Sequence, residues 1–77
     1  MMPHMIVEVG RTGRYRAYAL GAVRGEVSRY NARIWIWRVW RVIGPVTCAK
    51  GRTLGVRRAT SECLAALVAE VGDDTEA

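Results

Sequence analysis

Residues of the types that carry out catalysis or bind metals are few in this chain of 77 residues. His4 is the single histidine, and no Asp, Glu, Cys or Ser stands beside it at a spacing typical of a catalytic pair, so we expect a surface residue at the N-terminus. The sequence also lacks a glycine-rich phosphate loop, a nucleophile paired with a base, and paired carboxylates in its basic part. It therefore predicts a protein that is not an enzyme and holds no cofactor or metal.

The two cysteines, Cys48 and Cys63, stand 15 residues apart, with no further Cys or His at the spacing of metal ligands. They do not make the disulfide framework of a small secreted protein. We expect two free thiols, because Cys63 falls on the apolar stripe of a predicted helix, where it suits a small buried side chain. A disulfide between them requires Cα atoms within about 7 Å, so the sequence leaves this pairing open.

Basic residues dominate most of the chain. Residues 1–58 hold all 12 Lys and Arg with two acids, whereas residues 59–77 hold five acids and no base. A basic surface attracts polyanions, nucleic acid first. Eleven Arg and one Lys beside abundant Ala, Gly and Val are also what GC-rich coding produces, so nucleic-acid binding and a coding bias both stay open.

The stretch Arg33–Ile43, RIWIWRVWRVI, contains all three tryptophans and alternates them with β-branched residues and arginines. No Gly, Pro, Asn or Asp interrupts it, so it predicts a β-strand, whose side chains alternate between two faces. We expect Trp35, Trp37 and Val39 to face the core, because the arginines of that face stand at its two ends and can reach water. The opposite face carries Ile34, Ile36, Arg38, Trp40 and Val42.

The order of the expected elements indicates an α+β fold: an antiparallel β-meander of three or four strands with one C-terminal α-helix packed on one face, in a single domain over residues 1–77. The expected strands are Met5–Val9, Tyr15–Val23, Arg33–Ile43 and Val46–Ala49, with a turn at residues 11–14, a loop at Arg24–Ala32 and a turn at Gly44-Pro45. The helix is expected to take Thr53 as its N-cap, or to start as late as Thr60 or Ser61, and to end at Gly72. Residues 1–4 and 73–77 are expected to fray.

The expected core joins this helix to the strands. The helix contributes apolar residues at spacings of three and four, namely Val56, Ala59, Cys63, Leu64, Leu67 and Val71. We expect Ala17 and Ala19 of the second strand to pack beneath it together with the core face of the tryptophan strand. In that arrangement Arg14, Arg16 and Tyr18 lie on the same outer face as Arg38 and Trp40.

One helix shelters one side of a small sheet, so the other side needs a partner unless a loop or terminus folds over it. The main hypothesis is a non-enzymatic interaction module, a homodimer or a binder of a host protein, with the partner-binding residues Ile34, Ile36, Arg38, Trp40 and Val42. The alternative hypothesis is a nucleic-acid-binding protein with contacts from Arg14, Arg16, Tyr18, Arg38 and Arg41. The chain has no apolar run of about 18 residues and no secretion signal, so we expect a cytoplasmic protein with no membrane partner.

Two resemblances bear on these hypotheses. The run Gly55–Ala59 (GVRRA), continued by Ala65–Leu67, resembles the end of a double-stranded-RNA-binding domain, where a basic pair opens a final alanine-rich helix; this likeness implies RNA binding. As a whole, strands rich in Trp and Arg before one alanine-rich helix resemble the small accessory proteins of bacteriophages that infect high-GC actinobacteria. That second likeness implies a protein of the host cytoplasm, and some proteins of this kind bind host proteins.

Overall fold

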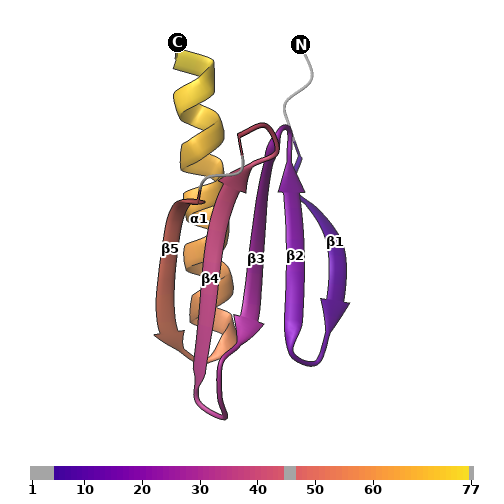
Figure 1. Ribbon diagram of the computed structural model, residues 1–77, viewed down its shortest axis with the longest axis vertical. Coiled ribbons are helices and arrows are strands. Elements are labelled where there is room, and N and C mark those ends of the chain that lie inside the picture. The colour runs from indigo at the N-terminus through magenta and orange to yellow at the C-terminus, as the bar shows by residue number, and fades with distance from the viewer. Residues whose placement is uncertain (1–4, 45–46, 77) are drawn as a thin grey trace.

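A five-stranded antiparallel sheet and one helix make up the fold, in a computed structural model that describes residues 5–44 and 47–76, with side chains up to Gly72. The strands follow one another in sequence order: β1 (Val7–Thr12), β2 (Tyr15–Leu20), β3 (Val23–Arg29), β4 (Ile34–Arg41) and β5 (Thr47–Leu54). Helix α1 (Val56–Glu76) then returns along one side of the sheet, behind β3, β4 and β5 as drawn in Figure 1. The α+β class and the single C-terminal helix are as the sequence predicts.

Short connections make the meander possible. The β2–β3 turn contains Gly21 at φ 59, and the β5–α1 link contains Gly55 at φ 82, two backbone conformations that favour glycine. The β3–β4 connection is held by Asn31, whose side-chain oxygen accepts hydrogen bonds from the backbone N–H groups of Arg33 (2.9 Å) and Ile34 (2.8 Å). Each turn reverses the chain within a few residues, so consecutive strands pair as neighbours.

The number of strands differs from the three or four expected, because Arg24–Ala32 is not a loop and most of it belongs to β3. Side chains of β3 alternate: Val23 and Val27 are fully buried, and Glu26 between them points to the opposite side. Gly25 suggests a loop in the sequence, yet it is a buried strand residue. A Cβ at this position would lie 2.9 Å from Sγ of Cys63 on α1. A glycine can mark a close approach between elements as well as a turn.

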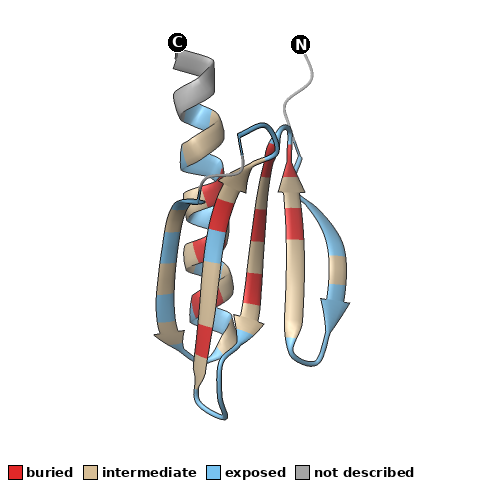
Figure 2. Ribbon diagram, viewed as in Figure 1, coloured by how far each residue is buried: buried red, intermediate tan, exposed pale blue. Residues whose placement is uncertain are grey.

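The core face of β4 is as predicted. Val39 is fully buried, Trp35 is 9% exposed, and Trp37 packs against the same cluster beneath α1. Figure 2 shows buried residues in β2, β3, β4 and the helix, with β1 and β5 lacking them. The core cluster consists of Tyr18, Leu20, Val23, Val27, Trp35, Val39, Ala59, Cys63 and Leu67.

The expected orientation of β2 is wrong. Tyr18 and Leu20 are buried on the helix side, and Ala17 and Ala19 lie on the other side of the sheet. β2 pairs with β3 and not with β4, and its register sets Tyr18 opposite Gly25.

Other boundaries also differ from the sequence prediction: β1 spans Val7–Thr12 and not Met5–Val9, and β2 ends at Leu20 and not at Val23. Strand β5 continues through Gly51 to Leu54, because Gly51 is covered by the indole of Trp37 on the neighbouring strand and is not a turn residue. Helix α1 begins at Val56, after Gly55 and not directly after Thr53, and it continues past Gly72 to Glu76. The expected fraying of residues 1–4 lies outside the described residues.

The β1 edge of the sheet extends beyond the helix. In the described part of the chain α1 contacts β2, β3, β4 and β5 but not β1. Val7 and Val9 of β1 are 54% and 58% exposed, and the pairing with β2 shifts register between Glu8 and Gly10, as at a β-bulge. Such a bulge in an edge strand discourages pairing with another chain.

Candidate functional site

The side of the sheet that α1 does not cover is called the open face here. Paired residues of antiparallel strands point to the same side, so the register places the members of this face in rows across the strands. Figure 1 looks onto this face, and no other described element lies in front of it. From β2 to β5 the open face consists of Tyr15, Ala17, Ala19, Arg24, Glu26, Ser28, Ile34, Ile36, Arg38, Trp40, Thr47, Lys50, Arg52 and Leu54.

Four of the five residues expected to bind a partner lie together on this face. Ile34, Ile36 and Trp40 are partly exposed, and Arg38 is exposed among them. Val42 lies just past the end of β4 and is 50% exposed, with its backbone N–H donating to the carbonyl of Ala22 at 2.9 Å. Trp40 therefore keeps part of its surface accessible, and no described loop encloses it.

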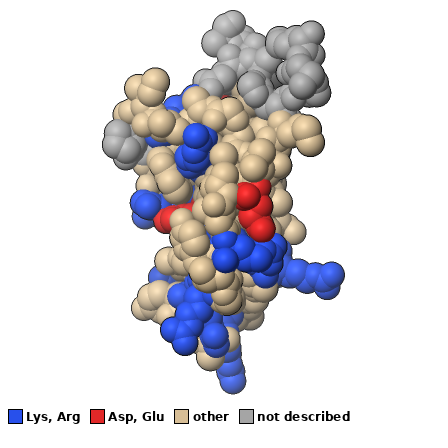
Figure 3. All heavy atoms as spheres, turned by 90° about the vertical axis from the view of Figure 1, so that its right-hand side faces the viewer, with Lys and Arg blue, Asp and Glu red and all other residues tan. Residues whose placement is uncertain are grey.

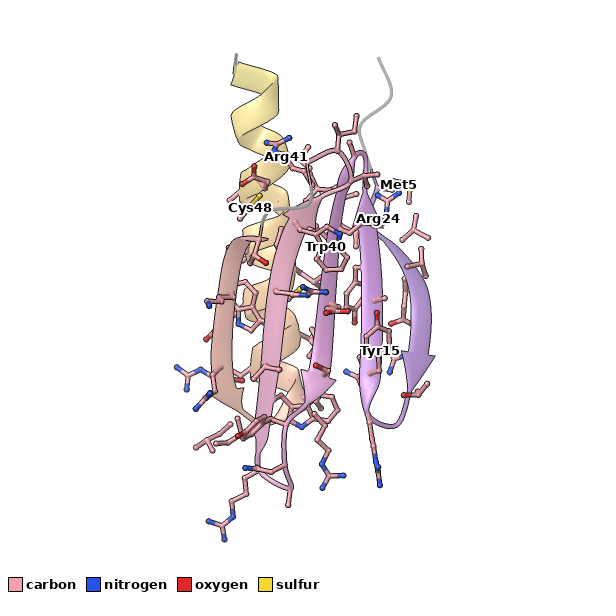
Figure 4. All side chains as sticks on the ribbon, viewed as in Figure 1. Met5, Tyr15, Arg24, Trp40, Arg41 and Cys48 are labelled. Atoms are coloured by element: carbon pink, nitrogen blue, oxygen red, sulfur yellow. The ribbon has the colours of Figure 1, made fainter. Side chains whose placement is uncertain are left out.

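A network across three strands holds Arg38 and Trp40 in place. The Nε of Arg38 donates to Oε1 of Glu26 at 2.5 Å, and the hydroxyl of Tyr15 donates to Oε2 of the same carboxylate at 3.0 Å. The Arg38 guanidinium lies over the Trp40 ring, 4.7 Å from its centroid. Figure 4 shows the labelled Tyr15 and Trp40 on the side of the sheet that faces the viewer.

This network also affects the titration of Tyr15. Burial, and next the hydrogen bond to Glu26, raise the pKa of the Tyr15 phenol above its ordinary value. The phenol therefore stays protonated at neutral pH and remains a donor to the carboxylate. Glu26 accepts from two donors at once, which fixes the position of the Arg38 side chain before any partner arrives.

A depression of ≈ 520 Å³ lies on the open face over β3, β4 and β5. Its apolar part includes Ile36, and polar groups from three strands surround it. The open-face residues that line it are Glu26, Ser28, Ile36, Arg38, Lys50 and Arg52.

Positive charge dominates the open face. Its described part carries the four cations Arg24, Arg38, Lys50 and Arg52 against the single carboxylate of Glu26. Seen from the β1 edge, Figure 3 shows more basic than acidic groups, with most of the basic ones in the lower part of the molecule. The face therefore attracts an anionic partner and repels a cationic one.

Most residues expected to contact nucleic acid do not lie on the open face. Of Arg14, Arg16, Tyr18, Arg38 and Arg41, only Arg38 does so. Arg16 and Tyr18 point to the helix side because β2 faces the opposite way from the expected one, and Tyr18 is 6% exposed. The expectation that these two residues share a face with Trp40 is wrong.

The other two residues of that set are placed elsewhere. Arg14 lies in the exposed turn between β1 and β2. Arg41 lies at the end of β4 on the helix side, where its Nη2 pairs with Oε2 of Glu70 at 2.5 Å. Figure 4 shows the labelled Arg41 beside the helix, away from Tyr15.

Lys50 and Arg52 are site residues that the sequence reasoning missed. They belong to β5, which extends to Leu54, whereas the sequence predicts a strand that ends at Ala49. Both residues therefore fall outside the predicted strand and are not assigned to either of its faces. The signal was present, since Lys50, Arg52 and Leu54 stand two residues apart and share one side of a strand. Glu26 and Ser28 were missed because they were assigned to a loop.

The two cysteines differ in burial. Cys48 is exposed on β5, and Cys63 is fully buried between α1 and the sheet. Burial, and next the charge of Glu26, raise the pKa of the Cys63 thiol to about 11. Within the described residues no group of three or more His, Cys, Asp or Glu is arranged to hold a metal ion.

Among the residues described, no helix combines the length and the apolar character needed to cross a membrane. No known family model, curated protein or solved structure matches this chain. The open face must therefore be interpreted from its own residues.

Proposed function

We propose that this protein is a small non-enzymatic interaction module and that its open face binds an anionic macromolecule. The observation that supports the proposal is the one-sided cover of the sheet: α1 packs on one face, and the described chain places nothing over the other. That second face presents Ile36 and Trp40 beside Arg38. Apolar, aromatic and arginine side chains in one patch are the composition of binding hot spots.

The patch is also preorganised for binding. Glu26 holds Arg38, and Arg38 lies against Trp40, so these side chains lose little further freedom when a partner binds. Less ordering means a smaller entropic cost of association. The five strands are joined edge to edge, so the positions of the side chains relative to one another are set by the sheet itself.

The charge of the open face selects among the partners considered. A second copy packed face to face would bring Arg24, Lys50 and Arg52 of both copies together with few carboxylates to offset them. A homodimer through this face is therefore less favourable than a complex with an acidic surface. A host protein with acidic side chains, or a nucleic acid, satisfies the same charges.

Backbone chemical-shift mapping by NMR tests the proposal. The labelled protein is titrated with polyglutamate at low salt, a polyanion that satisfies the charges without contributing rings of its own. We expect the largest shifts in β3, β4 and β5 and small shifts along α1. The paired variant Lys50→Glu with Arg52→Glu should abolish the shifts.

The matched control reverses the same number of charges on the helix. Arg57 and Arg58 are exposed at the start of α1, remote from the open face. Arg57→Glu with Arg58→Glu should leave the shifts of the open face in place. Equal loss in both variants, or shifts centred on the start of α1, would show that the open face is not the binding surface.

A further inference from the structure

Three of the four cations named on the open face line the depression, namely Arg38, Lys50 and Arg52. Lys50 and Arg52 are exposed, line it, and stand two residues apart on β5, a separation of about 7 Å along the strand. Two positive groups at this interval can contact successive phosphates of an extended polyanion chain. The chain would then run along β5, with its substituents directed toward β4 and β3.

Aromatic rings stand at both ends of the same depression. Arg38 lies over Trp40, with 4.7 Å between guanidinium carbon and ring centroid, and Arg52 lies over Tyr30 at 5.4 Å. Both arginines line the depression. Tyr30 is 62% exposed, so its ring is accessible to planar groups, whereas Trp40 is partly exposed and presents the guanidinium of Arg38 stacked on its ring.

The depression between these rings suits a planar heterocycle. Its volume of ≈ 520 Å³ lies within the range of small-molecule sites, roughly 300–1,000 Å³. Ile36 provides an apolar contact for a ring, and across from the cations Ser28 and Glu26 provide a hydroxyl and a carboxylate that can hydrogen-bond to the edge of a base. Cations on one side and groups for a base on the other match the two halves of a nucleotide.

We infer that the anionic partner of the open face is a single-stranded nucleic acid, an assignment that rests on the function proposed above. Its phosphates lie on Lys50 and Arg52, one base occupies the depression, and neighbouring bases stack on Tyr30 and on the Arg38 guanidinium that lies over Trp40. Single strands combine an anionic backbone with accessible ring faces, which is the combination that a basic groove with aromatic side chains binds. An acidic protein segment satisfies the cations but leaves both rings without a planar partner.

Fluorescence anisotropy with short oligonucleotides tests the inference. The probes, each of about ten nucleotides, are oligothymidylate, oligouridylate and an abasic phosphodiester of equal length, which keeps the charge and removes the bases. We expect the abasic probe to bind at least about tenfold more weakly than oligothymidylate, because base stacking contributes to binding by each nucleotide. Comparison of the DNA and RNA probes tells which sugar the face prefers. Tighter binding of either one than of the abasic probe supports the inference.

Variants assign the contacts. Lys50→Gln with Arg52→Gln should weaken oligothymidylate binding at least about tenfold and lower the slope of log affinity against log salt by about 1.4, which is about 0.7 for each phosphate contact of a single strand. Trp40→Leu should weaken oligothymidylate binding about tenfold. Tyr30→Leu tests the second ring in the same way, and because Tyr30 is exposed this substitution should not disturb folding. Arg57→Gln with Arg58→Gln, the control on α1, should change affinity by less than the first pair.

Three results would overturn the inference, and one of them also removes the proposed function. Equal affinity for the abasic probe would mean that the face binds a polyanion without reading bases, so the proposed function survives. Equal or tighter binding of a duplex of the same length would exclude the single strand. No binding of any probe, together with no shift of the open face in the polyglutamate titration, would reject both.

Discussion

The contact between Gly25 and Cys63 yields a quantitative prediction about the core. Gly25 is a buried residue of β3, and Cys63 is fully buried on α1. A Cβ at position 25 would lie 2.9 Å from the Cys63 sulfur, but at ordinary contact distances of 3.6 Å from Leu67 and 3.7 Å from Val39. The sulfur is thus the one close obstacle among these neighbours, and Gly25→Ala should be destabilising because of it.

The magnitude follows from opposing contributions. Overpacking of this kind costs about 1–3 kcal/mol, and replacing glycine by alanine recovers about 0.5–1 kcal/mol by restricting the unfolded chain. Gly25→Ala should therefore lower the free energy of unfolding by up to about 2.5 kcal/mol, and each kcal/mol lost lowers the melting temperature by about 4–8 °C in a domain of this size. Cys63→Ala alone removes one buried atom and should cost about 0.5–1.5 kcal/mol.

The double variant decides whether the reasoning is correct. When Cys63→Ala removes the sulfur, the new Cβ at position 25 fills the vacated space, so the two changes should be coupled favourably by about 1–3 kcal/mol. Urea unfolding of all four proteins, followed by tryptophan fluorescence and far-UV circular dichroism, measures this coupling. Gly13→Ala, where an added Cβ meets nothing within 4 Å, is the control and should change stability little. Additive costs for the two substitutions would refute the assignment of the clash to the sulfur.

Three further predictions concern the same core. Leu67→Ala, at a fully buried helix position, should cost about 2–5 kcal/mol; an unchanged urea midpoint would mean that this position is not in the core. Gly51→Ala should displace the Trp37 indole that covers Gly51, so it should cost about 1–3 kcal/mol and change the tryptophan emission spectrum, whereas an unaltered spectrum would argue against this packing. The raised pKa of Cys63, about 11 against 9.0 for a free thiol, means that the unfolded chain loses this proton first as pH rises. Stability should therefore fall between pH 9 and 11, with a contribution that Cys63→Ala removes and Cys48→Ala leaves; equal pH profiles for the two variants would contradict it.

The central strand was the most predictable part of the fold and of the site. Eleven residues without a breaker identify a strand, and the alternation of side chains within that strand groups Ile34, Ile36, Arg38 and Trp40 on one side. Both conclusions depend only on neighbours along the chain. The helix stripe is local in the same way, and its residues Ala59, Cys63 and Leu67 are indeed fully buried.

The errors come from contacts between elements. Gly25 and Gly51 suggested a loop and a turn, but each is a strand glycine covered by a large or buried group of another element, the Cys63 sulfur or the Trp37 indole. With these glycines interpreted as strand breaks, the predicted sheet lacks β3 and has a shorter β5. This interpretation also hid Lys50 and Glu26, so the predicted site lacked both the outer cations and the carboxylate that holds Arg38.

By itself the sequence determined which segments are apolar, the charge imbalance along the chain, and the two faces of the tryptophan strand, because these depend on residue type and on a period of two. Tertiary structure alone decided which way β2 faces: its pattern permits either orientation, and pairing with β3 sets Tyr18 opposite Gly25 on the helix side. It likewise decided the composition of the open face, since Tyr15, Glu26, Arg38 and Lys50 come from four strands whose register brings them together. A pattern within one strand carries no information about the neighbour across the sheet, and that neighbour determines what a surface can bind.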